Sequence, residues 1–196
     1  MPPHLTNADI FVHVRLVMGF IVSLSIARLL TGAARFVQHP ETQKIYPVHL
    51  LWSLSMLLML VHFWWWEFAL YTITSWTFEV YLFLVAYCIL LFVICTVLFP
   101  DSVAEYDGWE GYFYSRRKWF FGLFALTFVV DILDTWLKGP QRFDMYGPEY
   151  WVRAPVYIVL CAIAMWTTNR KFHWAFAIAS IAYQISFILR LFRTLL

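Results

Sequence analysis

Six long apolar runs, separated by shorter polar segments, set the pattern along the chain. Each is largely apolar over roughly 20 residues, the length that a helix needs to cross about 30 Å of hydrocarbon. The runs cover residues 10–35, 46–67, 76–99, 119–138, 150–168 and 174–193. This pattern predicts an all-α membrane protein, a bundle of six transmembrane helices.

A polar stretch at residues 101–118, acidic first and then basic, interrupts the apolar pattern. We expect a connecting loop there, between a first three-helix half at residues 1–100 and a second at residues 119–196. Because each half holds an odd number of crossings, a second copy of the first half would lie inverted in the membrane.

Short similarities between the halves fit such a repeat. Tyr46-Pro-Val-His49 opens the second run much as Tyr150-Trp-Val-Arg153 opens the fifth, and Ala86-Tyr87 has a counterpart in Ala182-Tyr183. Inverted repeats are common in transporters. Chance similarity among aromatic-rich helices explains the same residues, so two inverted three-helix repeats and a chance likeness both stay open.

The composition agrees with a membrane location. Hydrophobic residues make up 62% of the 196 residues and charged residues only 13%, whereas soluble domains are about half apolar and about a quarter charged. We therefore expect no soluble catalytic domain, and membrane lipid is an expected partner. The net charge of +2 comes without a basic patch, which excludes nucleic acid as a predicted partner.

Two carboxylates fall inside the fourth apolar run. Asp131 and Asp134 are three residues apart and share a helix face, and Lys138 follows Asp134 by four residues. If Trp136 marks the membrane interface, the rise of ~1.5 Å per residue places Asp134 only ~3 Å inside and Asp131 ~7–8 Å inside. We interpret Asp134 and Lys138 as an interfacial ion pair, and Asp131 as the costlier group.

Ionisable residues on the other runs match the depth of Asp131, because successive spans alternate in direction. Two interpretations follow: a polar vestibule on a transport path, or a structural network of ion pairs. The residues of this predicted layer, besides Asp131, are Arg15, Glu67, Glu79, Arg153 and Arg190, with His62 nearby. Arg28 lies at the opposite level and is not expected to reach Asp131.

Small residues recur every three or four positions on two runs, a spacing that lets helices approach closely. Close packing within the chain or self-association explains both stripes, so we expect a homo-oligomer or a subunit of a membrane complex. The residues are Gly19, Ser23 and Ala27 on the first run, and Ala175, Ala179 and Ala182 on the sixth.

Known catalytic and cofactor motifs are missing from the sequence, which has no nucleophile elbow, P-loop, dinucleotide fingerprint, HExxH or paired zinc motif. His49 and His62 are thirteen residues apart, about 220° around a helix, and do not face one haem. The cysteines lie in apolar runs without a CxxC motif, so structural disulfides are not expected. No metal is predicted, no cofactor is assigned, and an enzyme is not favoured.

The segments His49-Leu-Leu-Trp52 and His62-Phe-Trp-Trp65, after Ala27-Arg28-Leu-Leu-x-Gly32, resemble a group of uncharacterised bacterial multi-pass membrane proteins. The likeness covers the first two runs and implies a bacterial inner-membrane location, with no activity. Six spans place both termini on one side. The first ten residues and the link between the second and third runs lack Lys and Arg, which favours a periplasmic side for the termini.

Two functions remain as hypotheses. The first is a small channel or transporter for an ion or small solute, with a vestibule at Asp131. The second is a non-catalytic membrane scaffold or accessory subunit that binds a partner protein, lipid or pigment through its aromatic faces.

Overall fold

The computed structural model describes residues 6–39, 45–139 and 141–191, and all regular elements there are helices. The all-α prediction is confirmed. The elements are α1 (Asn7–Gln38), α2 (Pro47–Trp66), a 3₁₀ turn η1 (Glu67–Thr72), α3 (Phe78–Leu98), α4 (Gly108–Leu137), α5 (Gln141–Trp166) and α6 (Arg170–Leu191). The predicted end of the sixth helix, at residue 193, lies outside the described residues.

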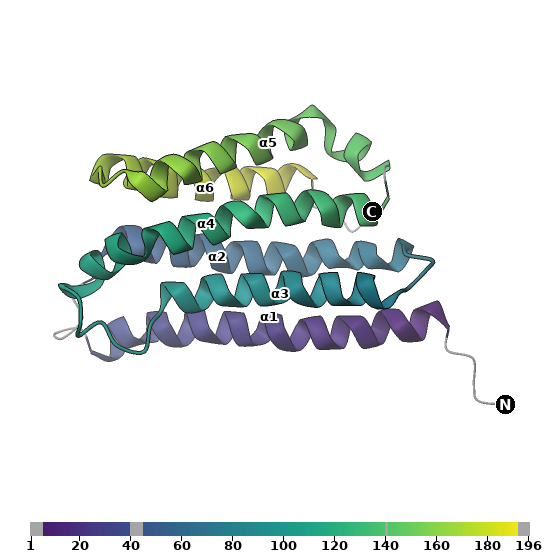
Figure 1. Cartoon of the computed structure of the whole chain (residues 1–196), viewed down its shortest axis with the longest axis horizontal. Coiled ribbons are helices and arrows are strands. Elements are labelled where there is room, and N and C mark those ends of the chain that lie inside the picture. The colour runs from purple at the N-terminus through teal and green to yellow at the C-terminus, as the bar shows by residue number, and fades with distance from the viewer. Residues whose placement is uncertain (1–5, 40–44, 140, 192–196) are drawn as a thin grey trace.

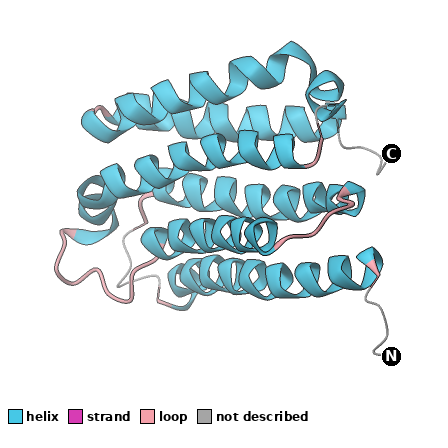
Figure 2. Ribbon diagram, turned by 45° about the vertical axis from the view of Figure 1, so that its right-hand side comes forward, coloured by secondary structure: helices cyan, strands magenta, loops and turns pink. Residues whose placement is uncertain are grey.

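The helices run side by side in two layers (Figures 1 and 2). Neighbours in one layer are α1, α3, α4 and α5, in that order, while α2 and α6 pack together behind them and contact α1 and α5 respectively. Helix α1 begins and α6 ends at the same end of the bundle (Figure 1).

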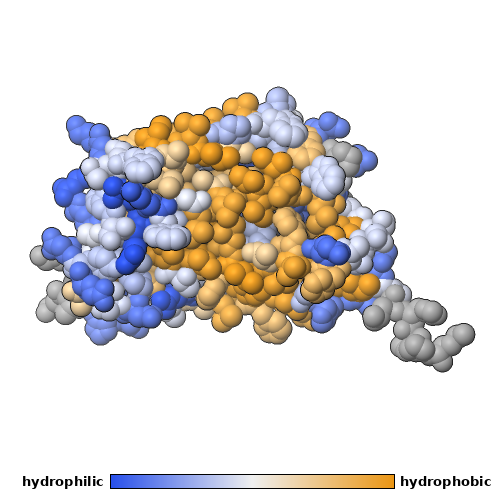
Figure 3. Space-filling model, in the orientation of Figure 1, coloured by the Kyte–Doolittle hydropathy of each residue, from blue (hydrophilic) through white to orange (hydrophobic). Residues whose placement is uncertain are grey.

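Five helices of the described chain are long and apolar enough to cross a membrane, namely α1, α2 with η1, α3, α4 and α6. Helix α5 has the length but is more polar, and it lies along α4. In Figure 3 an apolar band covers the middle of the visible face, with hydrophilic residues towards both ends. The chain is therefore a polytopic membrane protein.

Local sequence explains where several helices begin. Thr6 and Asp9 form a capping box that starts α1, and Pro47 stands in the first turn of α2, where its missing N–H costs nothing. Helix α5 is interrupted at Gly147, whose φ of 66° lies in the left-handed region that favours glycine. A short first segment of α5 therefore precedes the long one.

The polar stretch at residues 101–118 is only partly a loop, which corrects the prediction. Helix α4 begins at Gly108 and carries the basic residues of that stretch on its first turns. Polar residues are compatible with a helix that continues beyond the membrane, so polarity did not mark the helix start. The two halves also pack differently, since α1 lies against α3 whereas α4 lies against α5. The inverted repeat stays a prediction.

The small-residue stripes face outwards for most of their length. Gly19 lies against the Trp64 ring, but Ser23, Ala27 and the three alanines of α6 are exposed. Packing between α1 and α3 instead uses the opposite face, where Gly32 leaves room for the Phe99 ring. Self-association through the stripes stays a prediction.

An aromatic cluster fills the middle of the bundle. Trp52 is fully buried, and four phenylalanine rings surround it at centroid distances of 5.0–5.4 Å. They come from α4 and α6, so the cluster joins the two layers; the rings are Phe120, Phe121, Phe124 and Phe176.

Candidate functional site

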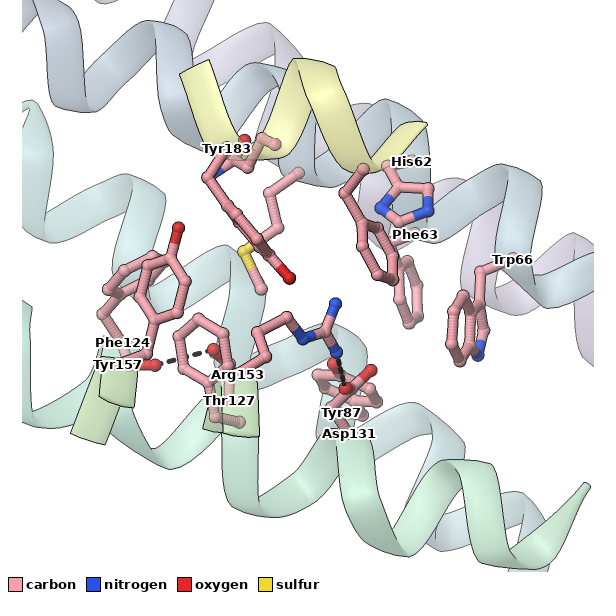
Figure 4. A pocket seen from close by; sticks show the side chains of 14 residues that line it. His62, Phe63, Trp66, Tyr87, Phe124, Thr127, Asp131, Arg153, Tyr157 and Tyr183 are labelled. Carbon is pink, nitrogen blue, oxygen red and sulfur yellow. Dashed lines mark hydrogen bonds and ion pairs between the residues drawn. The ribbon is translucent and has the colours of Figure 1, made fainter. Parts of the chain in front are cut away.

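A cavity of about 70 Å³ lies between α2, α4, α5 and α6, towards the end of the bundle where α4 ends. That volume has room for about five water molecules. Most of its wall is aromatic, with a few polar groups converging on it (Figure 4). The lining residues are Met59, His62, Phe63, Trp66, Tyr87, Phe124, Thr127, Phe128, Asp131, Arg153, Tyr157, Tyr183, Gln184 and Phe187.

An ion pair between Asp131 and Arg153 forms the polar wall of this cavity. The Arg153 guanidinium donates to Asp131 Oδ2, and the hydroxyl of Tyr150 donates to the same oxygen at 3.0 Å. The guanidinium also lies over the rings of Tyr150 and Phe187, 4.9 and 4.8 Å from their centroids. The structure thus brings together two residues that the sequence placed at one depth.

His62 and Gln184 complete the polar part of the wall. His62 meets the rings of Trp66 and Phe187 edge-on, at 5.9 and 6.0 Å. Gln184 donates from Nε2 to Ser55 Oγ at 2.7 Å, which joins α6 to α2. Gln184 was not among the predicted site residues, although a glutamine inside an apolar run is a signal for a buried hydrogen bond.

A second, separate cluster lies behind Trp66. Lys138 Nζ contacts Glu67 Oε1 at 2.8 Å and Asp134 Oδ2 at 2.5 Å, and all three side chains are at most 1% exposed. The indole Nε1 of Trp66 donates to Asp134 Oδ2 at 3.1 Å. The pairing of Asp134 with Lys138 is as predicted, and the pair is buried inside the protein, where Glu67 of η1 joins it. Its interfacial depth in the membrane stays a prediction.

The remaining members of the predicted layer lie elsewhere. Arg15 packs over aromatic rings, with Phe68 nearest at 4.2 Å. Glu79 is exposed in the first turn of α3. Arg190 makes two hydrogen bonds of 2.6 Å with Glu149. The residues expected in one layer therefore fall into separate groups. Asp131 pairs with Arg153 at the cavity, Glu67 belongs to the buried cluster, and Arg190 pairs with Glu149 outside both.

Arg28 belongs to the opposite end of the bundle, as predicted from its depth. It donates to Asp101 Oδ1 at 2.8 Å, in the link between α3 and α4. This hydrogen bond holds the pKa of the Asp101 carboxyl below its ordinary value. The contact ties the link to α1, far from the cavity.

Among the described residues, no group of three or more His, Cys, Asp and Glu side chains is arranged to hold a metal ion. The cavity offers hydrogen-bonding groups and aromatic faces, which suit an organic molecule. Comparisons with family models, with curated proteins and with solved structures find no match for this chain.

Proposed function

We propose that this protein binds a membrane amphiphile, whose polar head occupies the cavity and whose chain lies in a groove between α5 and α6. The groove has a volume of about 500 Å³ and an almost wholly apolar lining that includes Val152, Val156 and Ala179. The observation that carries the proposal is that Arg153, Tyr157 and Tyr183 line both the groove and the cavity. A molecule lying between the two helices can thus reach the polar wall.

The charges of the cavity favour an uncharged head. Asp131 already neutralises Arg153, so an anionic head gains little there. Two polar atoms are left over: Arg153 Nε, a donor, and Gln184 Oε1, an acceptor, are buried without a hydrogen-bond partner in the part of the chain that the structure describes. A hydroxyl group can satisfy both, because it donates one hydrogen bond and accepts another. The class of ligand is therefore a long-chain alcohol.

Blocking the groove should weaken this binding. We expect a photoreactive long-chain alcohol to label the wild-type protein in nanodiscs, and Val156→Phe to reduce the labelling by roughly tenfold or more, equivalent to ~1.4 kcal/mol of binding free energy. Val159→Phe is the matched control, because Val159 is exposed on α5 but does not line the groove. Equal labelling of the two variants, or preferential labelling by a fatty acid, would contradict the proposal.

Transport of an ion or small solute is the second candidate, because the cavity reaches Asp131. The aromatic cluster around Trp52 closes the middle of the bundle, so transport requires a rearrangement of α2, α4 and α6. Buried ionisable groups in membrane spans commonly mark such paths.

If the protein is a transporter, Asp131→Asn should abolish the flux of the transported solute into proteoliposomes. The substitution breaks the ion pair with Arg153 but keeps the side-chain size. Flux is compared at equal amounts of folded protein, checked by size-exclusion chromatography. Undiminished flux through the folded variant excludes a transport role for Asp131. Labelling by the alcohol in the same preparation distinguishes binding alone from transport.

A further inference from the structure

We propose that the cluster of Glu67, Asp134 and Lys138 is a proton-binding site, in which Glu67 is protonated at neutral pH. The proposal does not depend on an amphiphile or a solute in the cavity. It rests on the charges, hydrogen bonds and position of the cluster.

The formal charges of the buried cluster do not balance. Two carboxylates share one ammonium group, and all three side chains are shielded from solvent. On the cavity side of Trp66, Asp131 and Arg153 form a pair of their own and cancel. Binding one proton makes the cluster neutral, whereas full ionisation would leave one negative charge in a low-dielectric environment, which is costly.

The hydrogen bonds identify which carboxyl takes the proton. Asp134 Oδ2 accepts from Lys138 and from the Trp66 indole, whereas Glu67 accepts from Lys138 alone. Donors stabilise the charged form of a carboxylate, so Asp134 keeps its charge and Glu67 receives the proton. Glu67 Oε2 and Asp134 Oδ1 are both buried without a hydrogen-bond partner among the described residues, so the choice of Glu67 rests on the additional donor to Asp134.

In the part of the chain that the structure describes, the groups around the cluster supply no buried compensating charge. From α3, Tyr87 and Cys88 face it, and both are neutral side chains. From the first segment of α5, Tyr146 stacks on Trp66 at 4.6 Å and accepts a hydrogen bond from Arg142. Arg142 is partly exposed and lies on the outer side of Tyr146. Its charge is thus screened by solvent and does not replace the proton.

The cluster lies next to a surface recess, because Lys138 belongs to both. This recess has a volume of about 530 Å³, and Lys138, Thr72 and Arg142 line it. On the inner side, Trp66 separates the cluster from the cavity and contacts both. Protonation adds one proton from hydronium in the solvent to the Glu67 carboxylate and releases water, so Glu67 becomes a neutral carboxylic acid and the cluster loses its negative charge.

Infrared spectroscopy of the purified protein tests this assignment directly. We expect the wild-type protein at neutral pH to show the carbonyl stretch of a protonated carboxylic acid, shifted by exchange into heavy water. Glu67→Gln should abolish this band, since Asp134 and Lys138 then balance. Glu149→Gln is the matched control, because Glu149 pairs with Arg190 outside the cluster, and this variant should keep the band.

Two results of this experiment would overturn the proposal. Absence of the band from the wild-type protein overturns the proposal without any variant, and would mean that the cluster is ionised or holds a cation. A band that persists in folded Glu67→Gln places the proton on another carboxyl and also overturns the assignment. Alcohol labelling of the cavity has no bearing on either result.

Discussion

Lys138→Met should destabilise the protein by about 3–5 kcal/mol, the usual cost of removing one partner from a buried ion pair. The substitution keeps an unbranched side chain of similar length, so packing changes little. It leaves the Asp134 carboxylate beside Glu67 without a cation, in a site that solvent does not reach. The free energy of unfolding, measured by denaturant titration in micelles, gives the effect.

Two further variants separate charge from packing. Lys118→Met is the matched control, because Lys118 is an exposed lysine of the same helix, where it lies over the Trp166 ring. We expect it to change stability by less than about 0.5 kcal/mol, as surface substitutions usually do. A triple variant that combines Lys138→Met with Glu67→Gln and Asp134→Asn should recover most of the lost stability, because no unpaired charge then remains.

The three variants separate charge from packing because they are expected to lose different amounts of stability. If Lys138 only filled space, the triple variant would lose as much stability as Lys138→Met. If Lys138 balances charge, its replacement lowers the stability of the protein only while Glu67 and Asp134 keep their carboxyl groups. If Lys138→Met unfolds no more readily than Lys118→Met, the cluster is not held together by its charges.

The fold followed from the sequence because apolar length is a strong local signal. A run of about 20 apolar residues has few stable alternatives to a helix inside a bilayer, where every backbone group must be hydrogen-bonded. The start of α4 was less predictable, since a helix that continues past the membrane surface has a polar sequence like that of a loop. Gly108 marks that start only through its backbone conformation, with φ of 70°.

The candidate site was predictable in depth but not in lateral position. Helix rise places Asp131 and Arg153 at one level, and the structure joins them. Helix rise also places Asp134 close to the level of Trp136, whose ring is 69% exposed. Depth along a helix does not say whether a side chain faces lipid or protein, so the burial of Asp134 was not predicted. Burial of Asp134 depends on η1 and on the bend at Gly147, and neither position follows from periodicity within α4.

Trp52→Ala should cost about 3–5 kcal/mol, as removal of a large buried aromatic side chain commonly does. Trp52 is fully buried at the point where α2, α4 and α6 meet, with ring contacts to four phenylalanines. Inside a bilayer the loss is mainly one of packing contacts, since lipid chains are as apolar as the core.

Trp65→Ala is the control on the same helix. Its indole is 36% exposed and packs edge-on against Phe68 at 5.9 Å, so we expect a loss smaller than about 1 kcal/mol. Unfolding of both variants is followed under the same denaturant conditions. Equal losses would mean that tryptophan size, and not the central position of Trp52, sets the stability.

A rescue experiment shows whether the space left by Trp52→Ala stays rigid or collapses. A rigid apolar cavity remains dry and binds small apolar molecules such as benzene. The rings of Phe121 and Phe176 stack on each other at 5.9 Å and are held on separate helices, which favours a cavity that persists. Benzene should then raise the unfolding midpoint of Trp52→Ala and leave that of Trp65→Ala unchanged. No rise in either variant would show that the helices close around the missing ring, and that the centre of the bundle can rearrange as transport requires.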